Sequence, residues 1–154
     1  MYYIMVLLLM LILPLGSILA ELHVFQSQTD ILFLVGKWFV FWAVGIRLLT
    51  AGLRQILQPD FTAKEIFGLE HAESSQIVQE LGFSNLCVGL LGLITIFNAA
   101  WIMPAAITGG LFFGMAGLRH IASKDRGGHE IVAMISDLFI ALVLAIYAGY
   151  SLLT

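Results

Sequence analysis

Long apolar runs separated by short polar stretches dominate the pattern along the chain. A helix needs roughly 20 apolar residues to cross a hydrocarbon core about 30 Å thick. Five runs satisfy this requirement, at approximately residues 2–20, 32–56, 82–98, 101–121 and 132–153. The pattern therefore predicts an all-α integral membrane protein whose five transmembrane helices form a single domain, residues 1–154.

The boundary between the third and fourth runs is short. Only the residues NAAW, 98–101, separate them, and Pro104 lies three positions beyond Trp101. Proline suits the first turn of a helix, because its missing N–H has no partner to lose there. We therefore expect a tight helical turn at residues 98–104, with one long unbroken helix as the alternative.

The first run also raises the alternative of a cleaved signal peptide, because it is N-terminal and ends in small residues. No lysine or arginine precedes the run, however, and Ile18 stands where a small residue belongs if cleavage followed Ala20. We therefore expect residues 1–31 to form an additional N-terminal membrane helix with an outer loop.

Composition agrees with a membrane protein. Charged residues make up 11% of the chain, whereas soluble domains carry about 25%. Cys87 is the only cysteine, which excludes an intramolecular disulfide and a multi-cysteine metal site. The sequence contains no phosphate-binding loop, nucleophile elbow or zinc motif, and nothing indicates nucleic-acid binding. It therefore favours a protein that is not an enzyme, with no cofactor predicted beyond a bound quinone or lipid.

Basic residues gather on one side of the predicted bundle. Five of the seven flank the loops after the second and fourth runs: Arg54, Lys64, Arg119, Lys124 and Arg126. Loops rich in lysine and arginine face the cytoplasm. We therefore expect a cytoplasmic N-terminus, with Arg54, Arg119 and His120 at the cytoplasmic interface.

Two stretches 65 residues apart resemble each other. AGLRQILQPDFTAKEIFG at 51–68 and AGLRHIASKDRGGHEIVA at 116–133 share eight of 18 positions. After a gap, SNLCVGLLGLI at 84–94 aligns with SDLFIALVLAI at 136–146 and pairs Asn85 with Asp137. We infer a four-helix core of two tandem hairpins, residues 32–98 and 99–154, and sites in such repeats tend to form between the halves.

A resemblance to known proteins lies in the same stretches. GKWFVFWAVGIRLLTAGLRQILQPDFTAKEIFG, ELGFSNLCVGLLGLI and the later AGLRHI with EIVAMISDLF resemble an uncharacterised family of small bacterial integral membrane proteins, over about residues 32–145. More distantly, the arrangement is similar to DoxX-like four-helix membrane proteins. The resemblance implies a helical fold in a bacterial inner membrane and supplies no activity.

Arg47 is the most informative polar residue. It lies seven positions before Arg54, so both project from one helix face, with Arg47 about 10 Å deeper. An arginine at mid-helix costs roughly 2.5 to 3.5 kcal/mol on insertion scales, so it should face the bundle and find a partner. Asp137 lies at a similar depth, and Asn85 occupies the sister position. We expect these three residues to form an anion or proton site, or a structural ion pair that orients the helices.

Lys37 completes the candidate polar set, from the outer side of the second run. Its stem can reach the outer interface, and Trp38 and Trp42 are expected to be interfacial or packing aromatics. A ligand-binding role requires the Lys37 side chain to point inward instead.

The inner loops leave two further questions open. Their oxygen and nitrogen donors could hold a metal, but the spacing fits no metal motif, so solvated loops are expected. These donors are Glu70, His71, Glu73, His120, Asp125, His129 and Glu130. Thr62 and Glu65 suit a capping box, and the apolar Ile66, Phe67 and Leu69 would then form one side of a short helix on the membrane surface, a belt or a lid.

Small residues recur along the fourth run, at positions 106, 110 and 114, with Gly109 and Gly117 two turns apart. Such stripes let membrane helices approach closely. We expect close packing rather than a flexible gate, with the fourth run at the centre of the bundle.

Three functional hypotheses follow. The first is an accessory or scaffold component of a membrane assembly, which would associate with a membrane protein partner or with itself. The second is a small transporter or channel for a proton, an anion or a small solute, because polar residues lie between the two halves. The third is a quinone- or lipid-binding membrane protein, because the second run is rich in aromatic residues.

Overall fold

The computed structural model describes residues 2–26, 28–66, 71, 73–123 and 127–154, without the side chains of residues 2, 65, 66 and 73. These residues form helices and turns only. Five helical stretches among them are long and apolar enough to cross a membrane: Tyr3–Val24, Ile31–Leu57, Ser74–Ile94, Ala99–Ala122 and Gly128–Leu153. The prediction of an all-α protein with five membrane-spanning helices is confirmed.

Several stretches combine α-helical and π-helical turns. The first stretch contains α1 (Tyr2–Leu7), η1 (Leu8–Ile12), α2 (Leu13–Leu19) and η2 (Ala20–Val24). The second contains α3 (Ile31–Phe39), η3 (Val40–Ile46) and α4 (Arg47–Leu57), followed by α5 (Pro59–Phe61) and η4 (Thr62–Ile66). The remaining elements are α6 (Glu73–Ile94), the 3₁₀ turn η5 (Ala99–Trp101), α7 (Ile102–Ala122) and α8 (Gly128–Leu153).

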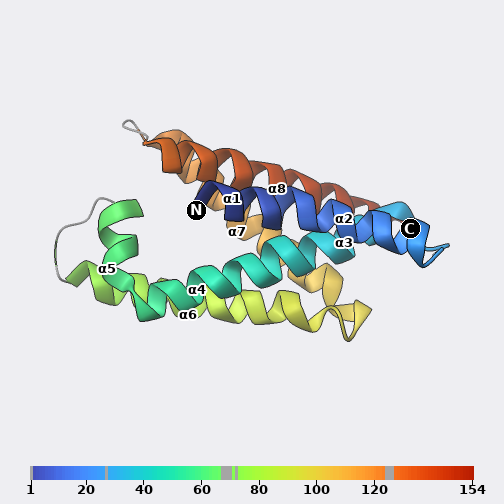
Figure 1. Cartoon of the computed structure of the whole chain (residues 1–154), viewed down its shortest axis with the longest axis horizontal. Coiled ribbons are helices and arrows are strands. Elements are labelled where there is room, and N and C mark those ends of the chain that lie inside the picture. The colour runs from blue at the N-terminus through green and yellow to red at the C-terminus, as the bar shows by residue number, and fades with distance from the viewer. Residues whose placement is uncertain (1, 27, 67–70, 72, 124–126) are drawn as a thin grey trace.

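The five stretches run antiparallel to their neighbours in sequence, and the two chain termini lie at opposite ends of the bundle (Figure 1). α4 packs mainly against α6, and α7 packs mainly against α8. The N-terminal stretch lies against the second stretch and α8. This arrangement fits two helical hairpins with one additional helix, whereas their origin by duplication stays a prediction.

Side-chain caps set two helix starts. Asp30 accepts hydrogen bonds from the Leu32 and Phe33 amides at 2.9 and 3.1 Å, which begins α3. Asn98 accepts one from the Ala100 amide at 3.0 Å and begins η5. The chain thus turns between α6 and α7, and the alternative of one long helix is wrong.

Two predicted boundaries are also wrong. α6 begins at Glu73 rather than near residue 82, because its first turns are amphipathic and escape a search for continuous apolar residues. Thr62 is not a helix cap, since helical structure already begins at Pro59, which suits a first helical turn. The expected capping partner Glu65 and the apolar Ile66 have no described side chain, and Phe67 and Leu69 lie outside the described residues.

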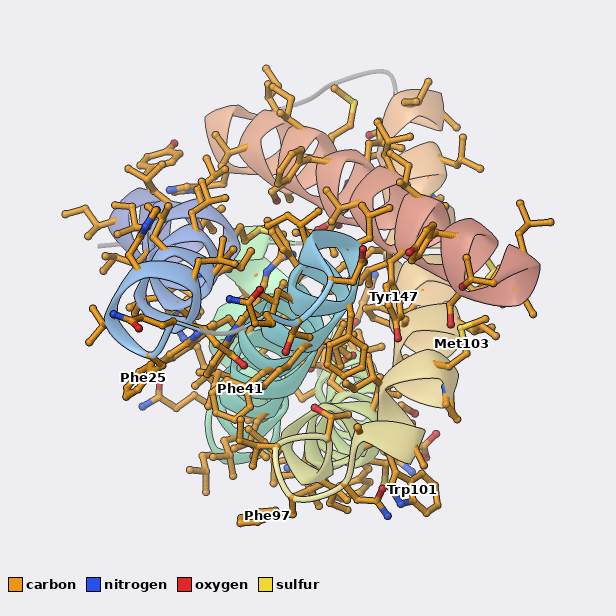
Figure 2. All side chains as sticks on the ribbon, turned by 90° about the vertical axis from the view of Figure 1, so that its right-hand side faces the viewer. Phe25, Phe41, Phe97, Trp101, Met103 and Tyr147 are labelled. Carbon is orange, nitrogen blue, oxygen red and sulfur yellow. The ribbon has the colours of Figure 1, made fainter. Side chains whose placement is uncertain are left out.

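The second stretch, rather than the fourth, occupies the centre of the bundle. In its most apolar window 44% of residues are buried, against 28% in each of the other four stretches. Its middle segment, η3, packs on both α6 and α7, while α3 packs on α8. Figure 2 looks along the bundle, with Tyr147 pointing inward and Phe97 and Trp101 at the periphery. Tyr147 covers Gly36 of α3.

The closest backbone contacts also involve the second stretch. A Cβ atom on Gly89 would lie 2.5 Å from the Leu49 nitrogen, and one on Gly92 would lie 2.5 Å from the Gly45 nitrogen. In α7, by contrast, a Cβ on Gly110 or Gly114 would meet only side-chain carbons, at 3.4 and 3.6 Å. Glycine is therefore required most strictly where α6 touches the second stretch.

Replacing Gly89 with alanine should lower the thermal unfolding temperature in detergent, because the new methyl group overpacks a backbone contact, at a cost of about 1–3 kcal/mol. Gly149→Ala is the matched control, since nothing lies within 4 Å of a Cβ there and alanine favours helix formation. Equal unfolding temperatures for the two variants would contradict this packing.

Candidate functional site

Arg47 and Asp137 form an ion pair between α4 and α8. The Arg47 Nη2 donates to Asp137 Oδ1 at 2.8 Å and to Ser136 Oγ at 3.4 Å. The Phe113 ring of α7 lies 4.8 Å from the guanidinium carbon. Only 13% of the Arg47 side chain and 8% of the Asp137 side chain are exposed. The pair therefore links the two hairpins in a largely dry environment.

A cavity of about 560 Å³ adjoins this pair. It is lined by α1, η1, α4, α5, η4, α6, α7 and α8, through Met5, Val6, Leu9, Arg47, Leu48, Thr50, Ala51, Arg54, Gln55, Phe61, Thr62, Leu81, Asn85, Phe112, Phe113, Met115, Ala116, His120 and Asp137. The two hairpins diverge toward the end of the bundle that carries α5 (Figure 1). Residues of both hairpins line the cavity, and Arg47 is the α4 residue of its wall that lies farthest from α5, so the Arg47–Asp137 pair marks its inner end.

The inner part of the cavity contains two polar atoms that lack partners. Asn85 is 4% exposed and donates from Nδ2 to Gln55 Oε1 at 2.7 Å. Its Oδ1, like Arg47 Nη1, is buried without a hydrogen-bond partner. A buried polar group left unpaired costs about 1–3 kcal/mol. Both atoms are almost inaccessible, so they belong to the packed wall of the cavity rather than to its surface.

The outer part of the cavity lies beside α5 and η4. The Arg54 guanidinium stacks 3.9 Å from the centre of the Phe61 ring. Thr62 of η4 is buried and lines the cavity with them. His120 of α7 faces the same space, and its Nδ1 lies 3.1 Å from Glu130 Oε1. α5 and η4 thus line the cavity through Phe61 and Thr62.

Two members of the predicted set lie elsewhere. Lys37 Nζ donates to both carboxylate oxygens of Glu21, at 2.9 and 2.8 Å, near the end of the bundle opposite α5. Trp38 Nε1 donates to the same carboxylate at 2.7 Å. Lys37 therefore fastens the N-terminal stretch to α3 and does not join the cavity. Arg119 is exposed on α7 and does not line the cavity either.

The expected metal donors do not gather among the residues that the structure describes. No group of three histidine, cysteine, aspartate or glutamate residues there could hold a metal ion. His120 pairs with Glu130, and the His129 ring stacks on Tyr3 with ring centres 5.1 Å apart. Glu70 and Asp125 lie outside the described residues, as does the side chain of Glu73.

Sequence reasoning missed Gln55, Glu21 and Phe113. Gln55 directly follows Arg54, so helical spacing put it at nearly the same depth, but spacing did not indicate that Gln55 contacts Asn85. Glu21 is the acidic residue at the end of the first apolar run and was available as a partner for Lys37. Phe113 carried no comparable signal, because one phenylalanine among several on an apolar helix does not indicate contact with a guanidinium.

The chemistry of the cavity is amphipathic. Its walls are mainly aliphatic and aromatic side chains, whereas its inner end holds an arginine whose charge Asp137 balances. Such a space suits a molecule with an apolar body and a small polar group.

A double-mutant cycle tests the ion pair. Arg47→Leu and Asp137→Leu should each lower the free energy of unfolding by about 3–5 kcal/mol, because each leaves a buried charge unpaired. The double variant should lose less than the sum of the two single losses. Unfolding of the purified protein in detergent measures all three, with the exposed Arg119→Leu as the control. Additive losses would show that the two charges do not interact.

Comparison with known proteins identifies a family. A family model described as a family of unknown function (DUF6790) matches residues 1–151. Neither the curated proteins nor the solved structures include a significant match. The uncharacterised family expected from the sequence is confirmed over more of the chain than residues 32–145, while the distant similarity to DoxX-like proteins stays a prediction. The chain belongs to the DUF6790 family, whose function is unknown.

Proposed function

We propose that the protein binds an amphipathic, lipid-soluble molecule in the cavity between its two hairpins. One observation carries the proposal: a cavity of about 560 Å³ with mainly apolar walls lies against the buried ion pair of Arg47 and Asp137. Ligand sites are typically cavities of about 300–1,000 Å³ with apolar walls and a few convergent polar groups. The cavity has this size and this distribution of groups.

Direct access from the bilayer supports a lipid-soluble ligand. Met5, Thr50 and Met115 line the cavity and are exposed residues, so the cavity reaches the surface of the bundle through them. In a membrane this surface faces acyl chains, so a hydrophobic molecule reaches the cavity without crossing water. A quinone or a lipid satisfies this condition, as the third sequence hypothesis requires.

The half of the bundle that lies beyond the Arg47–Asp137 pair, away from α5, argues against the transport hypothesis. Fully buried side chains fill the bundle there: Leu34, Val40, Val44, Ile102, Ile140 and Leu144. Transport across the membrane would require this packed half to open. Binding at one membrane leaflet requires no such rearrangement, so the geometry favours a binding protein. The accessory role is compatible with ligand binding and stays a prediction.

The positive-inside rule gives the proposal an orientation. Arg54 and Arg119 lie near the ends of α4 and α7, at the same end of the bundle as α5. Loops rich in basic residues face the cytoplasm. In this orientation the N-terminus is cytoplasmic and the cavity lies in the cytoplasmic leaflet, while the bacterial inner membrane expected from the sequence stays a prediction.

A steric block tests the proposal. Ala116→Phe should fill part of the cavity and displace the ligand, whereas Ala145→Phe adds the same side chain to an exposed position of α8. Native mass spectrometry of the protein extracted in mild detergent should show about one bound small molecule in the wild type and in Ala145→Phe, and a large loss of it in Ala116→Phe.

Two results would oppose ligand binding in the cavity. One is a wild-type protein that carries no small molecule and also fails to bind added lipids or quinones. The other is equal ligand content in the two phenylalanine variants, with both unfolding at the wild-type temperature, because the ligand would then occupy another surface.

A further inference from the structure

Arg54 gives the wall of the cavity a positive charge that no described carboxylate balances. The cavity is lined by Arg47, Arg54 and Asp137, and the first and last of these neutralise each other as an ion pair. Resting on the proposed function, we infer that the ligand is an anionic amphiphile. Its phosphate or carboxylate head lies at Arg54, and its hydrocarbon chain occupies the cavity.

The Arg54 guanidinium can bind such a head group. None of the ion pairs between described side chains includes Arg54. Its guanidinium stacks on Phe61, 3.9 Å from the ring centre, and the side chain is exposed. A guanidinium that stacks through its face keeps its N–H groups at the edge of its plane, where they can donate to two oxygens of a phosphate or carboxylate.

His120, the remaining titratable side chain of the lining, has a carboxylate of its own. Its Nδ1 lies 3.1 Å from Glu130 Oε1, and Glu130 does not line the cavity. Protonation of His120 is therefore balanced from outside the cavity. The charge to be matched by a ligand is that of Arg54.

The position of Arg54 places the head group at the membrane interface. Arg54 lies in the last turn of α4, near the end of the membrane-spanning stretch Ile31–Leu57. Arg47 lies about 10 Å deeper, at 1.5 Å per residue. An anion there would lie beside the buried Asp137 carboxylate, which is 8% exposed, and would be poorly solvated. The head therefore lies at the outer end of the cavity, with the chain pointing inward.

The space between the two arginines suits a hydrocarbon chain. Leu48 and Ala51 of α4 line it, together with Leu9 and Phe112 from other helical stretches. Each methylene group that leaves water for such a surface increases the affinity. The chain therefore supplies most of the affinity, whereas Arg54 selects the head group.

Two lipids that differ only by a phosphate test the inference. They are 1-oleoyl-lysophosphatidate, which is an anion, and monoolein, which is uncharged. Each competes with an uncharged fluorescent monoacylglycerol for the purified full-length protein in an uncharged detergent. We expect the lysophosphatidate to bind about fivefold more tightly, the ratio that corresponds to about 1 kcal/mol for one arginine near a membrane surface.

Two arginine variants show whether this preference arises at Arg54. Arg54→Gln should remove the preference and bind monoolein as the wild type does, whereas Arg54→Lys keeps the charge and should keep most of the preference. Arg119→Gln is the matched control, because Arg119 is exposed in the last turn of α7 and does not line the cavity. It should retain the full preference.

Three results would overturn the inference. The first is equal binding of the two lipids to the wild type. The second is an equal loss of preference in Arg54→Gln and Arg119→Gln, which would show a general attraction of anions to this end of the bundle. The third is displacement of the reporter by glycerol 3-phosphate at the concentration at which lysophosphatidate acts, which would make the site one for free phosphate esters.

The Ala116→Phe variant separates these results from failure of the proposed function. If this variant blocks binding of the uncharged reporter, the cavity binds an amphiphile whatever the charge of its head, and the proposed function survives. If neither lipid displaces the reporter and Ala116→Phe leaves the binding of the reporter unchanged, the proposed function is contradicted as well.

Discussion

The ion pair between Arg47 and Asp137 is the interaction on which the candidate site depends. It connects α4 to α8, and therefore one hairpin to the other. A buried arginine is tolerated in an apolar bundle only when its charge is compensated, so each residue requires the other. Because both residues also line the cavity, the same contact holds the hairpins together and forms part of the cavity wall.

The cavity exists because the two ends of the bundle pack differently. On the side of the pair away from α5, fully buried aliphatic residues fill the centre, and the second stretch touches α6 backbone to backbone at glycines. Toward α5, α4 keeps its contact with α6 while α7 stays with α8. Dense packing at one end thus fixes the hairpins and allows them to diverge at the other without loss of the fold.

The fold was readable from the sequence because hydrophobic length and composition determine which segments cross a bilayer. The pairing of Arg47 with Asp137 was suggested for the same reason, since buried charges need partners at the same depth. Packing order was harder to derive. The glycine-rich fourth run suggested that this run forms the central helix. The second stretch is central instead, because its glycines touch backbone atoms of α6 and the stretch also packs on α2, α7 and α8. Gln55 and Phe113 belong to the site because they contact Asn85 and Arg47 in the folded bundle, and residue spacing does not predict these contacts.

The distance between the hairpins at the α5 end tests the central claim most directly. Leu53 of α4 and Leu118 of α7 are both exposed, so each can be replaced by a spin-labelled cysteine after the exposed Cys87 has been replaced by serine. Double electron–electron resonance then measures the distance between the two labels. With the ion pair intact, the distance distribution should be narrow, and Asp137→Ala should broaden it because the hairpins lose their link. An unchanged distribution in the Asp137→Ala protein would contradict the account.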